Sequence, residues 1–177
     1  LDNSACPDIS VQMQAAVIWP EGAGKDLPVV LELGFGFYFG TFPGMPSSGG
    51  EAWYEQVVKR GWAAASIIPY TIQPDGGYGL RSGVIGLANR GAYRDPADWG
   101  ALRAWGWGAS RLLDYFEGEA LFDAGKVAIE GVSRYGKAAA VAMAFDERFA
   151  AGFIASSGKG GLAPWRRNCG EDTGNLT

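Results

Sequence analysis

The sequence of 177 residues contains no histidine. Without an imidazole, the chain cannot hold a complete Ser-His-Asp or Cys-His catalytic arrangement, and it cannot ligate zinc through histidine. A hydrolytic mechanism that uses a histidine as general base must therefore take that residue from outside this chain. We expect no bound metal.

Cysteine is also scarce, since Cys6 and Cys169 are the only two. They are too few for a disulfide framework and too far apart for a zinc knuckle, so one bridge and two free thiols both stay open.

The longest apolar run, residues 138–145, is far shorter than the ~20 residues of a membrane span. Leu1 is followed by neither a basic nor an apolar stretch, which predicts an internal or mature start instead of a signal peptide.

Positive charge is sparse as well. The 15 Lys and Arg residues are outnumbered by 19 Asp and Glu residues and form no dense cluster, which argues against a nucleic-acid partner. By contrast, hydrophobic residues make up 47% of the chain and aromatic residues 13%, enough for a sizeable core. No repeat or linker interrupts the sequence. We therefore expect residues 1–177 to belong to one domain.

Strand-like and helix-like segments alternate along the chain. Short apolar runs predict strands at residues 29–33, 63–68, 127–130 and 152–155. Between them, a capping box of Ser48 and Glu51 predicts a helix ending near Gly61, and Asp95 with Pro96 predicts the start of the longest helix, through residue 116. A third helix is expected at residues 135–145. This alternation predicts a parallel sheet with helices on both faces.

Residues 74–94 form a long, glycine-rich stretch without hydrophobic periodicity, which indicates a functional surface loop. A second glycine-rich stretch, residues 34–40, either lines a site at the end of the first predicted strand or is only a tight turn. Of the seven tryptophans, Trp99 and Trp105 stand at helical spacing and are expected in the core.

The third predicted strand runs directly into a helix through residues 131–137, Gly-Val-Ser-Arg-Tyr-Gly-Lys. One hypothesis makes Ser133 a nucleophile on a tight strand-to-helix turn, with Gly131 and Gly136 allowing the backbones to approach closely. A second makes Gly131 to Lys137 a phosphate-binding loop, but Ala138 stands where Ser or Thr would bind magnesium. A third makes Ser133 a simple helix cap.

Two cations follow Ser133, and both lie in the first turn of a helix whose residues 138–145 are apolar on every side, which predicts that this helix is buried. The positive end of a helix disfavours cations, so a negative group is expected to face them. The backbone N–H and guanidinium of Arg134 are placed to stabilise an oxyanion, while Lys137 lies one turn from Ser133 on the same face. The alternative is a salt bridge to an acid such as Glu130.

These residues resemble the glucuronoyl esterases of carbohydrate esterase family 15. The family's nucleophile signature, G-x-S-R-x-G-K, is matched by Gly131, Ser133, Arg134, Gly136 and Lys137. The likeness extends to the Trp-rich residues 98–108 and to the downstream segments 145–149, 157–161 and 166–171. It implies the N-terminal part of an α/β-hydrolase domain, a three-layer α/β/α sandwich, without a cofactor. It also implies a secreted or periplasmic enzyme that cleaves the ester between a glucuronic acid branch of xylan and a lignin alcohol.

By this resemblance, Ser133 is the nucleophile, Arg134 stabilises the oxyanion and Lys137 binds the sugar hydroxyls or the uronate. Two positions depart from the fungal pattern. Ser156 stands where fungal members place the catalytic acid, and Val132 replaces the fungal Cys, which points to the bacterial branch. The family's histidine lies further downstream. The alternatives are another carboxylesterase with the same turn, or a non-catalytic carbohydrate-binding relative.

Overall fold

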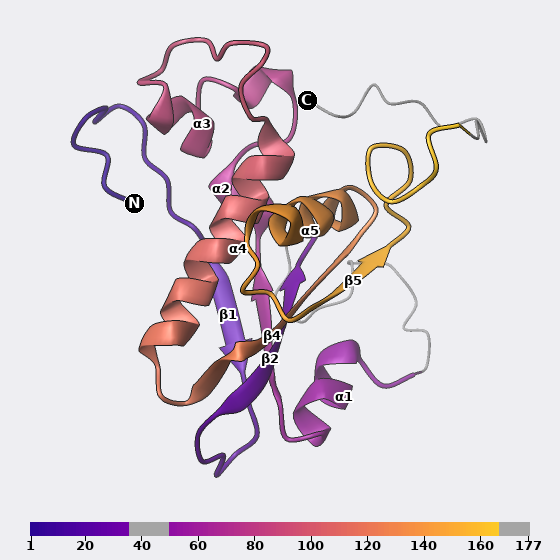
Figure 1. Ribbon diagram of the computed structural model, residues 1–177. Coiled ribbons are helices and arrows are strands. Elements are labelled where there is room, and N and C mark those ends of the chain that lie inside the picture. Colours follow the sequence, from indigo (N-terminus) through magenta and orange to yellow (C-terminus); the bar gives the residue numbers. More distant parts are fainter. Residues whose placement is uncertain (36–49, 167–177) are drawn as a thin grey trace.

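The computed structural model describes residues 1–35 and 50–166 and contains one mixed sheet (Figure 1). Its strands are β1 (Ala15–Ile18), β2 (Leu27–Leu33), β3 (Ala63–Ile67), β4 (Phe122–Val132) and β5 (Ala151–Ala155). They are ordered β1-β3-β2-β4-β5. β3, β2, β4 and β5 run parallel, as the alternating pattern predicted. β1, which the sequence analysis missed, pairs antiparallel with β3 at the edge.

The helices are α1 (Trp53–Lys59), α2 (Pro69–Ile72), α3 (Gly83–Ala88), α4 (Ala101–Gly118) and α5 (Arg134–Phe145), with a 3₁₀ turn at Gly77–Gly79. α4 and α5 cover one face of the sheet, where side chains from β2 and β4 pack against theirs without solvent exposure; these include Leu31, Ile129, Trp105, Leu113 and Ala142. α1 lies over the other face. A groove of about 420 Å³ between α1 and the sheet is lined on the sheet side by Val30 and Ala128. Helices therefore flank the sheet on both sides.

Three helix predictions need correction. The helix expected from Asp95 begins at Ala101, because the Asp95 carboxylate accepts the N–H of Ala97 in a separate turn. The helix expected from Ser48 begins at Trp53, and Glu55 is the acid that accepts an N–H at its start, from Ala52. Ser48 lies outside the described residues. Residues 74–94, expected to lack regular structure, contain the 3₁₀ turn and α3.

Two burial predictions are partly wrong. In α5, Ala138, Ala139 and Ala142 are buried, but Phe145 is largely exposed at the end of the helix, where its ring lies under the Arg103 guanidinium. Trp105 is fully buried as expected, whereas Trp99 retains 38% of its exposed area. Trp99 precedes α4 instead of lying on its inner face, which is why helical spacing misjudged it.

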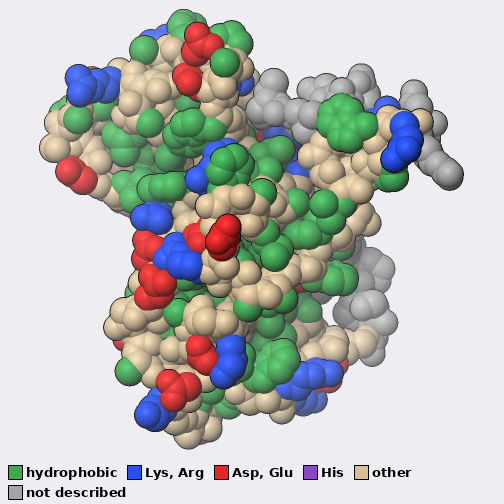
Figure 2. Space-filling view, viewed as in Figure 1, with side chains coloured by type: hydrophobic (Ala, Val, Ile, Leu, Met, Phe, Trp, Pro, Cys, Tyr) green, Lys and Arg blue, Asp and Glu red, His purple; other side chains and the backbone are tan. Residues whose placement is uncertain are grey.

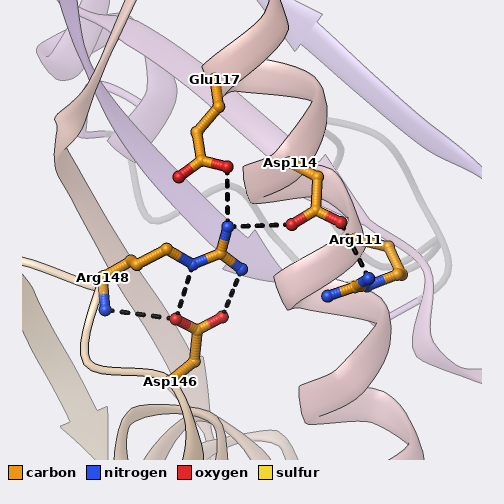
Figure 3. Close-up of polar contacts among 5 residues, drawn as sticks. All are labelled: Arg111, Asp114, Glu117, Asp146 and Arg148. Carbon is orange, nitrogen blue, oxygen red and sulfur yellow. Dashed lines mark hydrogen bonds and ion pairs between the residues drawn. The ribbon is translucent and has the colours of Figure 1, made fainter.

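An ionic cluster fastens the far end of α5 to α4 (Figure 3). The Arg148 guanidinium donates to Asp146 and to Asp114 and Glu117 of α4, at 2.7–2.9 Å. These bonds hold the pKa of Asp146 well below its usual range, mainly through the hydrogen bond from Arg148. Figure 2 shows acidic and basic side chains next to one another over α4, and on this face they are interleaved instead of forming a basic stripe.

Among residues 1–35 and 50–166, no helix combines the length and apolar character needed to cross a bilayer. The same residues bring no three His, Cys, Asp or Glu side chains together as a metal site. Cys6 is half-buried and unbridged there, and Cys169 lies outside the described ranges.

Candidate active site

One residue, Ser133, separates the end of β4 from the start of α5. Its backbone has φ 56° and ψ −122°, a conformation that costs a non-glycine residue about 1–3 kcal/mol. The Ser133 N–H donates to the carbonyl of Ala155 on β5, and its own carbonyl accepts from Lys137 N–H. The side chain makes no capping hydrogen bond and is exposed. Ser133 therefore occupies the N-cap position of α5, but its side chain does not cap the helix, and the turn presents the Ser133 hydroxyl to solvent.

The two glycines of the motif make this turn sterically feasible. A Cβ at Gly131 would collide with the carbonyl oxygen of Tyr135. A Cβ at Gly136 would lie 2.8 Å from the carbonyl oxygen of Ala155 and 2.9 Å from that of Gly131. The close approach predicted from the sequence is confirmed. The phosphate-loop interpretation is wrong, because Gly136 and Lys137 already belong to the first turn of α5 and no open loop precedes them.

Arg134 is fixed by groups that the sequence analysis did not name. Its Nε donates to Asp75 Oδ1 at 2.6 Å, and its guanidinium lies 5.4 Å from the ring centre of Trp105. Trp105 packs edge-on against Tyr135 at 5.2 Å. Among the described residues, this first-turn cation pairs with Asp75, which comes from the stretch 74–94 and is 59 residues away in sequence.

Buried Gln73 anchors that stretch beside Arg134. Its side-chain NH₂ donates to Gly79 O at 2.8 Å, and its side-chain oxygen accepts the N–H of Ile85 at 2.9 Å. Trp105 Nε1 in turn donates to the Gln73 carbonyl at 2.8 Å. Because all of these groups are buried, leaving any one unpaired would cost about 1–3 kcal/mol. The stretch 74–94 is therefore held firmly against the start of α5.

Lys137 lies one turn into α5 and keeps only 7% of its exposed area. Its Nζ donates to the carbonyl of Lys159 at 2.6 Å. Lys159 belongs to the Ser-Gly-Lys-Gly-Gly segment after β5, in which the Ser157 hydroxyl also accepts the N–H of Leu162. The structure thus places Lys137 between the nucleophile turn and the next loop. Ser156, just after β5, also has a positive φ, 44°.

Two carboxylates lie side by side beneath the turn. Glu32 of β2 and Glu130 of β4 are register partners, and Ser66 of β3 donates to Glu32 at 2.9 Å. Burial, reinforced by the charge of Glu32, raises the pKa of Glu130 to about 7. Burial also raises the pKa of Glu32, against the lowering effect of Ser66. Ser66, Glu32 and Glu130 lie side by side on three neighbouring strands, on the face of the sheet opposite the buried Leu31 and Ile129.

The structure places Ser133, Arg134 and Lys137, which the sequence singled out, directly after the end of β4 and in the first turn of α5. The sequence analysis missed Asp75, Gln73 and Glu32, because no local pattern shows that these residues meet their distant partners. Of the glycine-rich stretch 34–40, only Gly34 is among the described residues.

Comparisons with known proteins find carbohydrate and glucuronoyl esterases. Residues 91–176 match the family model "Glucuronyl esterase, fungi". A carbohydrate esterase from an unknown prokaryotic organism is 36% identical over 119 residues, which are 66% of this chain and 27% of that protein.

Solved structures extend the likeness. A glucuronoyl esterase of family 15 from Teredinibacter turnerae is 43% identical with a TM-score of 0.77, covering 90% of this chain and 40% of that one. A mutant glucuronoyl esterase from Sporotrichum thermophile, in complex with methyl 4-O-methyl-beta-D-glucopyranuronate, is 25% identical with a TM-score of 0.60, covering 86% of this chain and 36% of that one. The chain therefore spans well under half the length of these relatives.

The Gly131→Ala variant is expected to be destabilised by roughly 2 kcal/mol or more, because the new Cβ would collide with the backbone of Tyr135. Thermal unfolding of the full-length protein measures this. Gly118→Ala is the matched control, since a Cβ there meets nothing within 4 Å and its Tm should be unchanged or slightly raised. Equal Tm values for the two variants would contradict the packing described for the turn.

Glu130 should make stability depend on pH. Its carboxyl binds a proton more tightly in the folded than in the unfolded chain, so the free energy of unfolding should fall as pH rises from about 4.5 to about 7. Glu130→Gln is expected to flatten this slope and to raise the Tm at pH 8. Exposed Glu119, changed to Gln, is the control and should leave the slope as it is. If the free energy of unfolding depends on pH identically in Glu130→Gln and wild type, the raised pKa of Glu130 is ruled out.

Proposed function

Since the chain belongs to carbohydrate esterase family 15, we propose that it is the N-terminal portion of an α/β-hydrolase domain, a serine esterase. The proposed reaction is hydrolysis of glucuronate esters that link the glucuronic acid of xylan to lignin alcohols. The observation that carries this proposal is Ser133, exposed at a strained one-residue turn between β4 and α5, with Arg134 directly after it. A strained strand-to-helix turn is the geometry that exposes a nucleophilic hydroxyl in α/β-hydrolases.

In the proposed mechanism, the Ser133 oxygen attacks the ester carbonyl while its proton passes to a histidine outside these 177 residues. The resulting oxyanion is stabilised by Arg134 and by the positive end of α5. Collapse of the tetrahedral intermediate expels the alcohol, which takes the proton from the histidine. The glucuronoyl group is then bound as an ester to Ser133. Water attacks this ester while giving a proton to the histidine, and collapse of the second tetrahedral intermediate releases glucuronate as the Ser133 oxygen takes the proton back. The acid that orients the histidine also lies outside the residues assigned here.

Arg134 suits an oxyanion-binding role because its position is fixed before substrate arrives. A guanidinium carries five N–H donors in a planar fork. Asp75 accepts from Nε, and the guanidinium lies over the Trp105 ring, so two contacts restrict the position of the fork. Preorganised donors of this kind do not need to reorient as charge develops on the carbonyl oxygen.

Lys137 is proposed to bind substrate through hydroxyls of the sugar or through its uronate end. The side chain lies on the same face of α5 as Ser133, one helical turn away. Its bond to Lys159 O fixes the ammonium beside the loop that follows β5. An ammonium fixed in this way interacts equally with bound substrate and transition state, and therefore contributes to affinity more than to the chemical step.

Two rival functions make different predictions. Another carbohydrate or general carboxylesterase would use the same turn on a different acyl group. A non-catalytic carbohydrate-binding relative is favoured by the absence of histidine from these 177 residues and by Ser156, which cannot orient a histidine as a carboxylate does. Hydrolysis of a glucuronate benzyl ester, compared with an acetyl ester, separates all three.

We further propose glucuronoxylan or lignin–carbohydrate esters as the substrate and a secreted or periplasmic location. The Sporotrichum thermophile relative was solved with a methyl ester of a glucuronic acid, which supports this acyl group. A polymer of this kind cannot enter a cell, so the enzyme must meet it outside the cytoplasm. The proposed chemistry needs no metal and no cofactor.

Ser133→Ala is expected to abolish hydrolysis of a glucuronate methyl or benzyl ester in the full-length protein, because no other hydroxyl occupies the turn. Far-UV circular dichroism and Tm should match those of wild type. Ser10→Ala, at an exposed serine near the N-terminus, serves as the control and should retain full activity. Near-wild-type turnover by Ser133→Ala would show that another residue is the nucleophile.

Arg134→Ala is expected mainly to lower kcat, by about a hundredfold, since an oxyanion contact formed only in the transition state contributes roughly 3 kcal/mol. Lys137→Ala should mainly raise KM. Steady-state kinetics on one glucuronate ester test both, with Arg60→Ala, just after α1, as the control that changes neither constant. Exchanged kinetic effects would mean exchanged roles, and unchanged kinetics with a lower Tm would mean that both residues are only structural.

A further inference from the structure

A polar groove of about 720 Å³ lies between the N-terminal segment and residues 77–93. It is separate from the strand-to-helix turn, and the proposed mechanism does not use it. Its wall carries two tyrosines, Tyr78 and Tyr93, and two arginines, Arg81 and Arg90, with Asp8 on the N-terminal segment. The stretch 74–94, which the sequence marked as a functional loop, supplies most of this surface.

The tyrosines of the groove are far more exposed than aromatic residues usually are. Tyr78 keeps 85% of its exposed area and Tyr93 keeps 81%. A ring exposed to this extent contributes little to the core, whereas an aromatic face with a polar tip is well suited to binding a ligand that is partly apolar and partly wet. A pyranose ring is such a ligand, because one face carries C–H groups and its rim carries hydroxyls.

Arg81 is held in place within the groove. Its Nε donates to the Gly91 carbonyl at 2.7 Å, and its guanidinium lies 4.8 Å from the centre of the Tyr93 ring. These contacts orient the guanidinium fork, which binds carboxylates in a bidentate manner. With Arg90 and Asp8 the groove carries a net positive charge, although the chain as a whole has a charge of −4. The groove is therefore complementary to an anion.

The groove is rigidly connected to the proposed catalytic turn. The stretch 74–94 also contributes Asp75, which pairs with Arg134. Buried Gln73, just before this stretch, holds Gly79 and Ile85 through its side-chain amide. A ligand bound against Tyr78 and Arg81 thus has a defined position relative to Ser133.

We propose that this groove is a subsite for an acidic polysaccharide. Tyr78 and Tyr93 stack on pyranose rings of the chain, and Arg81 with Arg90 binds a free uronate carboxylate on it. The assignment rests on the proposed function, because it takes the ester-bearing xylan as the ligand that spans groove and turn. It adds a second recognition element that a small ester substrate does not reach.

The experiment compares two substrates in the full-length protein. Tyr78→Ala and Arg81→Lys are each expected to lower kcat/KM on a polymeric glucuronoxylan ester roughly five- to tenfold, while kcat/KM on a benzyl glucuronate changes less than twofold. Arg81→Lys keeps the charge and removes the fork. Tyr115→Ala on α4 and Arg60→Lys just after α1 are the controls and should leave kcat/KM on both substrates unchanged. If the ratio of kcat/KM on the polymer to kcat/KM on the small ester is the same in the groove variants as in wild type, the proposal is overturned.

A binding measurement separates this proposal from the proposed function. In gels containing glucuronoxylan, wild type should be retarded relative to gels without it, and both groove variants should migrate faster than wild type, whether or not the protein hydrolyses esters. Equal retardation by a neutral xylan would overturn the role of the arginines. A lower Tm of the groove variants with unchanged retardation would show that another segment of the protein occupies the groove. That result would also overturn the assignment.

Discussion

The change of direction within one residue, at Ser133, is the constraint on which the rest of this structure depends. A strand that becomes a helix within one residue must bring its last backbone carbonyls against the first helical turn. Only glycine fits at 131 and 136, where any side chain would meet backbone atoms of Tyr135 or Ala155. The strain at Ser133 is sustained because α5 is fixed along its length, by α4 along the buried alanines and by Arg148 at its far end. The core of the fold thus stabilises the conformation that exposes the hydroxyl.

The two cations at the positive end of α5 explain how distant segments assemble around that turn. A helix N-terminus repels Arg134 and Lys137, so each requires an acceptor from elsewhere. Asp75 supplies one from the stretch after β3, and the carbonyl of Lys159 supplies the other from the stretch after β5. The locally unfavourable charges therefore act as attachment points. They draw the loops that follow two different strands to one edge of the sheet.

Sequence patterns predicted the parts of this molecule whose signal is local. The parallel strands β2, β3, β4 and β5 could be predicted because their short apolar runs alternate with segments of helical periodicity. Ser133 could be singled out because its motif is contiguous in the sequence. β1 escaped because it has only four residues and none of them is fully buried, so it carries no clear alternation. Asp75 and Gln73 escaped because their partners lie far away or are backbone groups. Trp99 was misjudged because helical spacing says nothing of where the first turn begins.

The stretch 74–94 divides its residues between two unequal tasks. On its inner side, Gly83 leaves no space for a side chain, since a Cβ there would lie 2.6 Å from the Gln73 side-chain oxygen and 2.9 Å from the Ile72 carbonyl. On its outer side, Tyr78, Arg90 and Tyr93 project from that scaffold into solvent. Substitutions at the outer positions leave the buried anchor intact. Such a loop can diversify its surface during evolution while the position of Asp75, and with it the geometry at Arg134, stays fixed.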